Sequence, residues 1–411
     1  MISRDTTGSF KLMKSMNRAL ILNTIRTHGP ISRADIAKKT KLTPPTVTNI
    51  SGELLKSGLI NEGETGVSKG GRRPILLTIN WNSQFVIGID IGVRKVRLIL
   101  TNLKAEIVSK RVEKLPVPLT ADDLTGIMTA AVKKLIDAAE VDPGKLLGIG
   151  VGMHGIVDAE KGVSLYAPTL NLKDIPLKDV LEQAFRIPVK VENDAKTLAL
   201  GERWYGGHGP DTDNLVCVNV GEGIGAGIIF NNRIYHGNDH IAGEIGHMVV
   251  DIDGPRCSCG NYGCLQTVAG GRALKEYVLR EAALGRETSI LEAAGGNPDE
   301  ADGKIIYECA LKGDGLALEA FAKTGRYLGL GLLNLIHLVN PPLVVIGGGV
   351  AKAGDLILKP VQNLVKQRGI TEKAKRTDIA ISRLGEEGTA FGAVTLVLAD
   401  FFALEAKTEK R

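Results

Sequence analysis

Phe85-Val-Ile-Gly-Ile-Asp-Ile-Gly92 decides the fold class, because it reads as a buried strand that ends in a glycine turn. Strand-like runs at residues 96–102 and 106–109 follow it after short polar turns. The same order returns later, where Asn214–Val220 leads into Gly221-Glu-Gly-Ile-Gly225 and two further strand-like runs. Two copies of one three-stranded beginning predict a duplicated body with two lobes and a cleft between them.

The rest of the body reads as α/β, with strand-like runs at 146–151 and 189–192 and helical segments after them. The chain has 411 residues, enough for two ordinary domains besides a small N-terminal module. Its longest apolar stretch, Leu328–Val350, is interrupted by Asn334 and Pro341-Pro342, so we interpret it as a buried helix and a strand. No N-terminal signal peptide is recognisable, and we expect a cytoplasmic protein without a membrane partner.

The charge of the chain is concentrated at its N-terminal end. Residues 1–80 contain 13 Lys and Arg against 5 Asp and Glu, whereas the remainder contains 38 against 41. A small basic module on a mildly acidic body indicates a reader of polyanions.

The basic module has the pattern of a winged helix-turn-helix. Residues 17–25 place apolar side chains on one helical face, and Gly29-Pro30 ends that helix. Ser32 and Thr43 are suitable N-caps for two further helices, the second with Pro44 at its first position. Two short helices joined by a tight turn, followed by two strands, predict a DNA-binding head over residues 1–80.

The predicted DNA contacts fall on the third helix and on the wing. Small polar side chains at the start of a recognition helix suit readout of base edges, and arginines beside flexible glycines suit a narrow minor groove. The alternative is a protein-interaction module with a solvated basic loop. The DNA-contact candidates are Arg33, Thr43, Thr46, Thr48, Asn49, Arg72 and Arg73.

Six motifs of the chain resemble the ROK family (repressors, open reading frames and sugar kinases), a branch of the actin-like sugar kinases. An N-terminal winged helix on such a body is the layout of the xylose, glucose and N-acetylglucosamine repressors of that family. The motifs are Asp90-Ile-Gly92, Glu192-Asn-Asp-Ala195, Gly221-Glu-Gly-Ile-Gly-Ala-Gly227, Gly243-Glu-Ile-Gly-His247, Cys257-Ser-Cys-Gly-Asn-Tyr-Gly-Cys264 and Gly347-Gly-Gly349.

The resemblance implies an RNase H-like, two-lobed body behind the head. The first actin-like lobe is expected over residues 83–195, completed by about 390–411. The second is expected over 196–389 and carries the cysteine-rich loop.

Three of the five cysteines, Cys257, Cys259 and Cys264, fall within eight residues. A disulfide framework is not expected in a chain without an export signal. Three thiolates need one more ligand for a tetrahedral zinc ion, and His247, ten residues upstream, is the near candidate and the residue that the family pattern uses. Four protein ligands would make the zinc structural; the alternative is three unliganded turn cysteines.

A sugar site is predicted around Asn193, Asp194 and Glu244, because carboxylates accept hydroxyl protons and an amide both donates and accepts. The alternative is that Asn193-Asp194 only caps the next helix, although helix capping and sugar binding are compatible. The resemblance adds His247 and the position of Gln266, where the family usually has Glu. It also makes Asp194 the general base if the chain is a kinase.

Two departures from the kinase pattern argue against catalysis. Val93 stands where the kinases carry Thr or Ser, and Glu222 replaces a Thr in the second glycine-rich loop. A carboxylate in a phosphate-binding loop would repel ATP.

The sequence therefore predicts a sugar-responsive DNA-binding regulator and not an enzyme, most simply a repressor of carbohydrate genes. The alternative is an ATP-dependent sugar kinase with an appended head. The expected partners are a roughly palindromic double-stranded operator, a small sugar effector and a second copy in a homodimer or homotetramer. The segment 254–259 is slightly closer to the xylose repressors.

Overall fold

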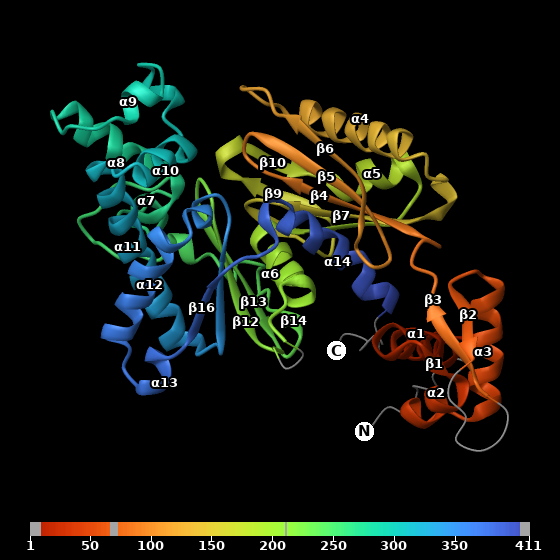
Figure 1. Ribbon diagram of the computed structural model, residues 1–411. Helices are drawn as coiled ribbons and strands as arrows, with labels where there is room; N and C mark the ends of the chain where they lie inside the picture. Colours follow the sequence, from red (N-terminus) through yellow and green to blue (C-terminus); the bar gives the residue numbers. More distant parts are fainter. Residues whose placement is uncertain (1–9, 66–72, 210–211, 403–411) are drawn as a thin grey trace, which may run out of the picture.

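The computed structural model describes residues 10–65, 73–209 and 212–402 (Figure 1). The N-terminal part forms a head of three helices and an antiparallel sheet of order β1-β3-β2. Its elements confirm the predicted winged helix-turn-helix. In chain order they are α1 (Phe10–His28), β1 (Ile31–Ser32), α2 (Arg33–Thr40), α3 (Pro44–Lys56), β2 (Ile60–Thr65) and β3 (Ile75–Ile79).

Local chemistry sets the helix starts of the head. Ser32 Oγ accepts the Asp35 N–H at 3.1 Å and donates to Asp35 Oδ2 at 2.7 Å. Because the Asp35 carboxylate binds the Ser32 hydroxyl and not the Ser32 backbone N–H, the two residues do not form a full capping box. Thr43 Oγ1 caps α3, with Pro44 in its first turn. Val47 and Leu54 are fully buried, which turns the opposite face of α3 to solvent.

The first sheet of the body has the order β11-β7-β4-β5-β6. β4, β5 and β6 form an antiparallel meander, and β7 and β11 add parallel to β4. Apolar side chains of β4 alternate between two cores, one under α4 and α5 and one under α14 (Figure 1). The elements are β4 (Phe85–Ile91), β5 (Lys95–Asn102), β6 (Ile107–Lys114), α4 (Ala121–Ala139), β7 (Leu146–Met153), α5 (Leu177–Phe185), β11 (Val189–Asn193) and α14 (Gly388–Phe402).

The second sheet, of order β14-β13-β12-β15-β16, repeats the meander and then adds parallel strands. Its helices pack into the largest core of the described residues. The predicted buried helix and strand at 328–350 correspond to the second half of α11 and to β15. The elements are β12 (Leu215–Val220), β13 (Ile224–Phe230), β14 (Arg233–Ile234), α8 (Gly271–Ala283), α10 (Gly303–Leu311), α11 (Gly315–Val339), β15 (Leu343–Gly347), α12 (Asp355–Arg368) and β16 (Asp378–Ile381).

Shorter elements connect these layers. A small antiparallel sheet follows β7 and packs on the first lobe. It contains β8 (Ile156–Asp158), β9 (Val163–Ala167) and β10 (Leu172–Ile175), and the short helices are η1 (Pro143–Lys145), η2 (Pro168–Leu170), η3 (Ile245–His247), α7 (Gln266–Ala269), α9 (Ile290–Ala293), η4 (Pro298–Glu300), η5 (Val350–Ala353), α13 (Glu372–Lys375) and η6 (Gly385–Glu387).

Helix α6 (Asp194–Tyr205) joins the two lobes, since it packs against α14, β12 and β13 (Figure 1). Glycines permit the close approach of α14. A Cβ on Gly150 of β7 would lie 1.8 Å from the Ala393 carbonyl oxygen, and one on Gly392 would lie 1.7 Å from the Thr197 carbonyl oxygen of α6. The lobe boundary expected at residues 195 and 196 falls in the first turn of α6 and stays a prediction.

The head is attached to the body through a short hydrogen-bonded junction, residues 80–84. Asn80 donates its backbone N–H to Leu59 O at 2.9 Å on the head side, and Leu103 donates to Trp81 O at 3.0 Å on the body side. One hydrophobic cluster also runs from head residues such as Ile25 to Val394 of α14. Head and body therefore share a core. Among the described residues no helix is both long and apolar enough to cross a membrane.

Candidate functional site

The predicted base-reading residues lie on the outward side of α3. Thr48 and Asn49 are exposed, and Thr46 is half-buried. Thr43 and Thr46 share a hydrogen bond between their hydroxyls at 2.8 Å, and Thr43 also caps the helix. Thr48 and Asn49 are therefore the free polar groups of this surface, whereas Thr43 and Thr46 are partly engaged within the head.

The basic candidates are distributed differently. Arg33 lies at the start of α2 and forms an ion pair with Glu62 of the wing strand β2 at 2.7 Å. Arg73 is exposed two residues before β3 begins. Arg72 lies outside the described residues.

At the predicted sugar site, Asn193 ends β11 and caps α6. Its Oδ1 accepts the backbone N–H groups of Ala195 and Lys196 at 3.0 and 3.1 Å, and its Nδ2 donates to Gly155 O at 2.9 Å. The capping role considered from the sequence is thus present. One N–H of the amide remains for another partner.

Asp194 follows in the first turn of α6 and accepts a hydrogen bond from Asn219 Nδ2 at 3.0 Å. Burial raises the pKa of Asp194, and the neighbouring His154 opposes this shift. His154 Nδ1 lies 3.4 Å from Ile91 O, to which it donates when that nitrogen carries the proton, and its Nε2 is buried without a partner among the described residues. The end of β11 thus holds a buried carboxylate with a histidine beside it.

Glu244 lies just before η3, close enough to Asp194 and Lys196 for their charges to act on it. Burial raises the pKa of Glu244 above its ordinary value, with His247 opposing. Lys196 is itself 2 % exposed and donates to His240 O at 2.6 Å. Two carboxylates and an amide, partly buried, suit a neutral ligand that donates several hydroxyl protons.

The predicted metal ligands form one cluster. The ligand atoms of His247, Cys257, Cys259 and Cys264 all lie within 4.8 Å of one another. Cys257 Sγ is 3.6 Å from His247 Nδ1, and Cys259 Sγ is 3.7 Å from Cys264 Sγ. All of these cysteines are free thiols. Their Sγ–Sγ separation rules out a disulfide and is close to the edge, about 3.8 Å, of a tetrahedron with Zn–S bonds of about 2.3 Å.

The environment of the thiols differs from one to the next. Burial favours the neutral Cys257 thiol, but hydrogen bonds from the Cys259 backbone and from Gln266 outweigh it and lower the pKa of Cys257 to about 6. Burial raises the pKa of Cys264 to about 12. A cation would relieve the crowding of these sulfur atoms, so the donor set fits a soft divalent metal.

Gln266, at the start of α7, contacts both the cluster and a glycine-rich turn. Its Nε2 donates to Cys257 Sγ at 3.2 Å, while its Oε1 would lie 3.0 Å from a Cβ on Gly223. His247 directs Nδ1 towards Cys257, which leaves Nε2 for a second partner.

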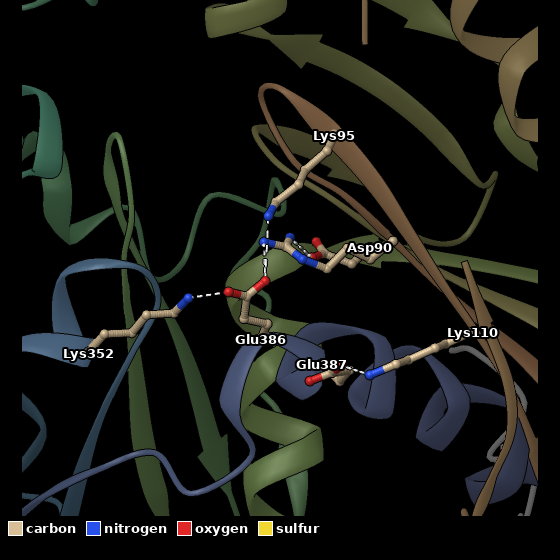
Figure 2. Close-up of polar contacts among 7 residues, drawn as sticks. Asp90, Lys95, Lys110, Lys352, Glu386 and Glu387 are labelled. Atoms are coloured by element: carbon tan, nitrogen blue, oxygen red, sulfur yellow. Dashed lines mark hydrogen bonds and ion pairs between the residues drawn. The ribbon is translucent and has the colours of Figure 1, made fainter. Parts of the chain in front are cut away.

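An ion-pair network beside these residues links segments that are far apart in the sequence (Figure 2). Arg97 of β5 donates to Asp90 at 2.8 Å and to Glu386 at 3.4 Å. Glu386, in η6 before α14, also binds Lys95 of the first lobe and Lys352 of the second. The bond from Lys352 lowers the pKa of Glu386 to about 2, whereas burial raises the pKa of Asp90 to about 6. Glu222 pairs with Arg94 at 3.7 Å.

The sequence model of the ROK family matches residues 86–400, which is most of the chain. This chain belongs to the ROK family. The resemblance predicted from the six motifs is thereby confirmed. The model of the MarR family matches residues 14–62, which adds an independent match for the DNA-binding head in front of the ROK body.

Relatives of this ROK protein match over nearly their whole length. A protein described as a putative xylose repressor from Caldicellulosiruptor sp. is 38% identical over 96% of this chain and 98% of its own. The DNA-binding transcriptional dual regulator NagC of Escherichia coli is 33% identical over 95% and 94%.

Solved structures agree with the fold of head and body. A ROK family transcriptional regulator, described as a homolog of the E. coli MLC protein, superposes with a TM-score of 0.82 at 29% identity, covering 95% of this chain and 98% of that one. A ROK family glucokinase from Streptomyces griseus, in complex with glucose and AMPPNP, superposes at 0.70 with 33% identity over 76% and 98%.

Several polar residues around the candidate sugar site of this ROK protein were not singled out from the sequence. His154, Lys196, Asn219 and Glu386 carry no local pattern, because each is defined by a partner far along the chain. Asp90 was quoted only as part of a motif. A charged residue inside an apolar strand or helix, as at Asp90 and Lys196, is the signal that could have identified two of them.

Proposed function

We propose that this chain is a sugar-responsive transcriptional repressor that binds an operator through its head and a sugar in the interlobe cleft. The observation that carries the proposal is the shared core of head and body, with a buried cluster of hydroxyl-binding groups at the start of α6. Relatives described as repressors match over both parts of the chain. The xylose repressors among them make a pentose or hexose sugar the first ligand class to test.

In this proposal Asp194 and Glu244 accept hydroxyl protons, and the remaining N–H of Asn193 donates to a sugar oxygen. His247 contributes Nε2, and Gln266 contributes the N–H that is not bound to Cys257. Binding energy gained at these groups shifts operator affinity only if the sugar prefers one arrangement of the lobes and head.

The cysteine cluster is proposed to hold a structural Zn²⁺ through His247, Cys257, Cys259 and Cys264. A closed four-ligand site leaves no position for a reacting molecule. The ion would stabilise the loop that carries His247 and Gln266 next to the sugar.

The kinase alternative is favoured only by Asp194 and by the likeness to the glucokinase. Val93 and Glu222, which pairs with Arg94, argue against the kinase alternative. The network at Glu386 also argues against it, because it places a carboxylate among the cations that would otherwise be available to phosphate groups. We infer that the chain is not an enzyme. ADP release with Mg-ATP and a sugar panel tests this, and clear turnover contradicts it.

Operator binding is expected from a homodimer or homotetramer on a roughly palindromic site, since winged-helix heads read half-sites in pairs. The decisive experiment is fluorescence anisotropy with DNA from upstream of this chain's own gene, titrated with D-xylose, D-glucose and N-acetyl-D-glucosamine. Tight, salt-sensitive binding that one sugar alters supports the proposal. Binding that no sugar alters contradicts the effector role, and no specific binding contradicts the regulator.

A further inference from the structure

Arg26 of the head lies against two aromatic rings of the body. Its guanidinium carbon lies 4.9 Å from the centre of the Trp204 ring and 5.1 Å from that of Phe402. Its Nε donates to Asn23 Oδ1 at 3.0 Å within α1, and no acidic group pairs with it in the part of the chain that the structure describes. The cation is thus stabilised by ring faces rather than by a carboxylate.

The two rings terminate the two helices that pass the proposed sugar site. Trp204 lies in the last turn of α6, whose first residue is Asp194. Twelve residues of helix separate the two ends by about 18 Å. Phe402 ends α14, which lies along α6 and begins beside Glu386. The same pair of helices therefore touches the cleft at one end and Arg26 at the other.

The two helices are fixed to each other along their length. A Cβ on Gly201 of α6 would lie 2.7 Å from the Gly388 carbonyl oxygen, which leaves no space for sliding. Near the head, the ring of Tyr205 lies 5.8 Å from that of Phe391 of α14. A displacement at Asp194 is consequently carried to the aromatic rings rather than absorbed in between.

The contact at Arg26 differs in kind from the apolar contacts around it. Side chains such as Ile25 and Val394 keep most of their contact area when packed elements shift slightly. The energy of a cation over a ring face depends on where that ring lies, and Arg26 contacts two such rings.

We propose that Arg26 is a positioning residue that transmits sugar occupancy at the start of α6 to the orientation of the DNA-binding head. The inference rests on the proposed function, because it names the route by which a sugar alters operator affinity. Coupling of this kind is measured as the ratio of operator Kd values with and without sugar.

The test uses the full chain with Arg26→Met, which keeps an unbranched apolar stem but removes the guanidinium group and its charge. Arg18→Met, at an exposed position of the same helix, is the matched control, and Arg26→Lys is the conservative variant that restores a cation. The probe is whichever of D-xylose, D-glucose and N-acetyl-D-glucosamine alters wild-type binding. Three quantities are measured: operator Kd with and without the sugar, sugar Kd without DNA, and Tm.

Arg26→Met should bring the ratio of the two operator Kd values close to one while the sugar Kd stays within about twofold of wild type, and Arg26→Lys should recover part of the ratio. Arg18→Met should keep the full ratio. A purely structural role would lower Tm without changing the ratio. If Arg26→Met does not fold, Phe402→Leu removes one ring and carries the same expectation.

A wild-type ratio retained in Arg26→Met or Phe402→Leu overturns the inference and leaves the proposed function intact. A wild-type chain that responds to none of the sugars contradicts the proposed function, and the inference with it.

Discussion

Gln266 Nε2 donates to Cys257 Sγ across 3.2 Å, so one side chain of the candidate sugar site is held by the cysteine cluster. Its carbonyl oxygen faces the turn at Gly223. A change in the charge or position of the Cys257 sulfur is therefore expected to move a group that faces the cleft. Metal content and effector binding should be linked for this reason.

Cys259→Ser is expected to lower the zinc content of the purified chain well below one ion per chain, because a hydroxyl is a poor replacement for a thiolate ligand. The free energy of unfolding should fall by at least about 2 kcal/mol, seen as a Tm lower by roughly 4–8 °C. Elemental analysis and thermal melting provide the measurements.

Cys309→Ala is the control for that variant, since Cys309 is buried in α10 away from the cluster. It should retain the metal. Full metal retention in Cys259→Ser would remove Cys259 from the ligand set.

Asp194→Asn should weaken sugar binding by roughly 10- to 150-fold, the loss of a charged hydrogen bond of about 1.5–3 kcal/mol. Operator binding without sugar should be unchanged, because Asp194 lies in the cleft and not on the head. Titration calorimetry measures the sugar affinity, and fluorescence anisotropy measures the operator affinity. Asp137→Asn, exposed on α4, should change neither, and an unaltered sugar affinity in Asp194→Asn would remove Asp194 from the site.

Asn49→Ala should reduce discrimination between operator and scrambled DNA by about 1–3 kcal/mol, the range for one good base contact. Arg73→Ala should instead weaken binding to both DNAs alike and reduce the slope of log K against log salt by about 1. Anisotropy at several salt concentrations separates the two effects. Unchanged binding in both variants would contradict the placement of DNA on α3 and the wing.

Glu386→Gln is expected to lower the free energy of unfolding at neutral pH by less than about 1 kcal/mol, seen as a slightly lower Tm, because the side chain is partly exposed and its pairs are screened. The folded-state pKa of about 2 lies below the ordinary value of 4.5, so the carboxylate stabilises the fold above pH 4.5. That contribution is lost as the pH falls from 4.5 towards 2.

The Tm difference between wild type and Glu386→Gln should therefore be constant from pH 7 to 5 and smaller at pH 3.5. Glu276→Gln, which breaks the isolated surface pair with Arg272, is the comparison variant. A difference that grows on acidification would contradict the role of the ionised carboxylate.

Local signals in the sequence were sufficient for much of the fold. Thr43 and Pro44 marked the start of α3 because capping and a missing N–H depend only on adjacent residues. The repeated strand and glycine turn predicted both meanders, because strands and tight turns also depend on residues that are adjacent in the sequence. The cysteines, five and two residues apart, predicted a cluster that the structure brings together with His247.

Contacts between distant segments could not be predicted in this way. Lys95 and Glu386 are 291 residues apart, and neither position shows a periodic pattern that pairs it with the other. Arg26 was one basic residue among 13 in the head, and its partners Trp204 and Phe402 come from two different helices. Such pairings arise from tertiary packing. The spacing of residues along one sequence does not show which distant residues will meet.

The hydrogen-bonded junction at residues 80–84 has a consequence for the DNA. In the proposed dimer, two heads that each share a core with their own body would resist the large rotation needed to follow half-sites whose helical phase has changed. Inserting about five base pairs between the half-sites turns one of them to the opposite side of the duplex, since a turn takes about ten. The helical phase between the two half-sites would therefore matter for operator recognition as much as their base sequences.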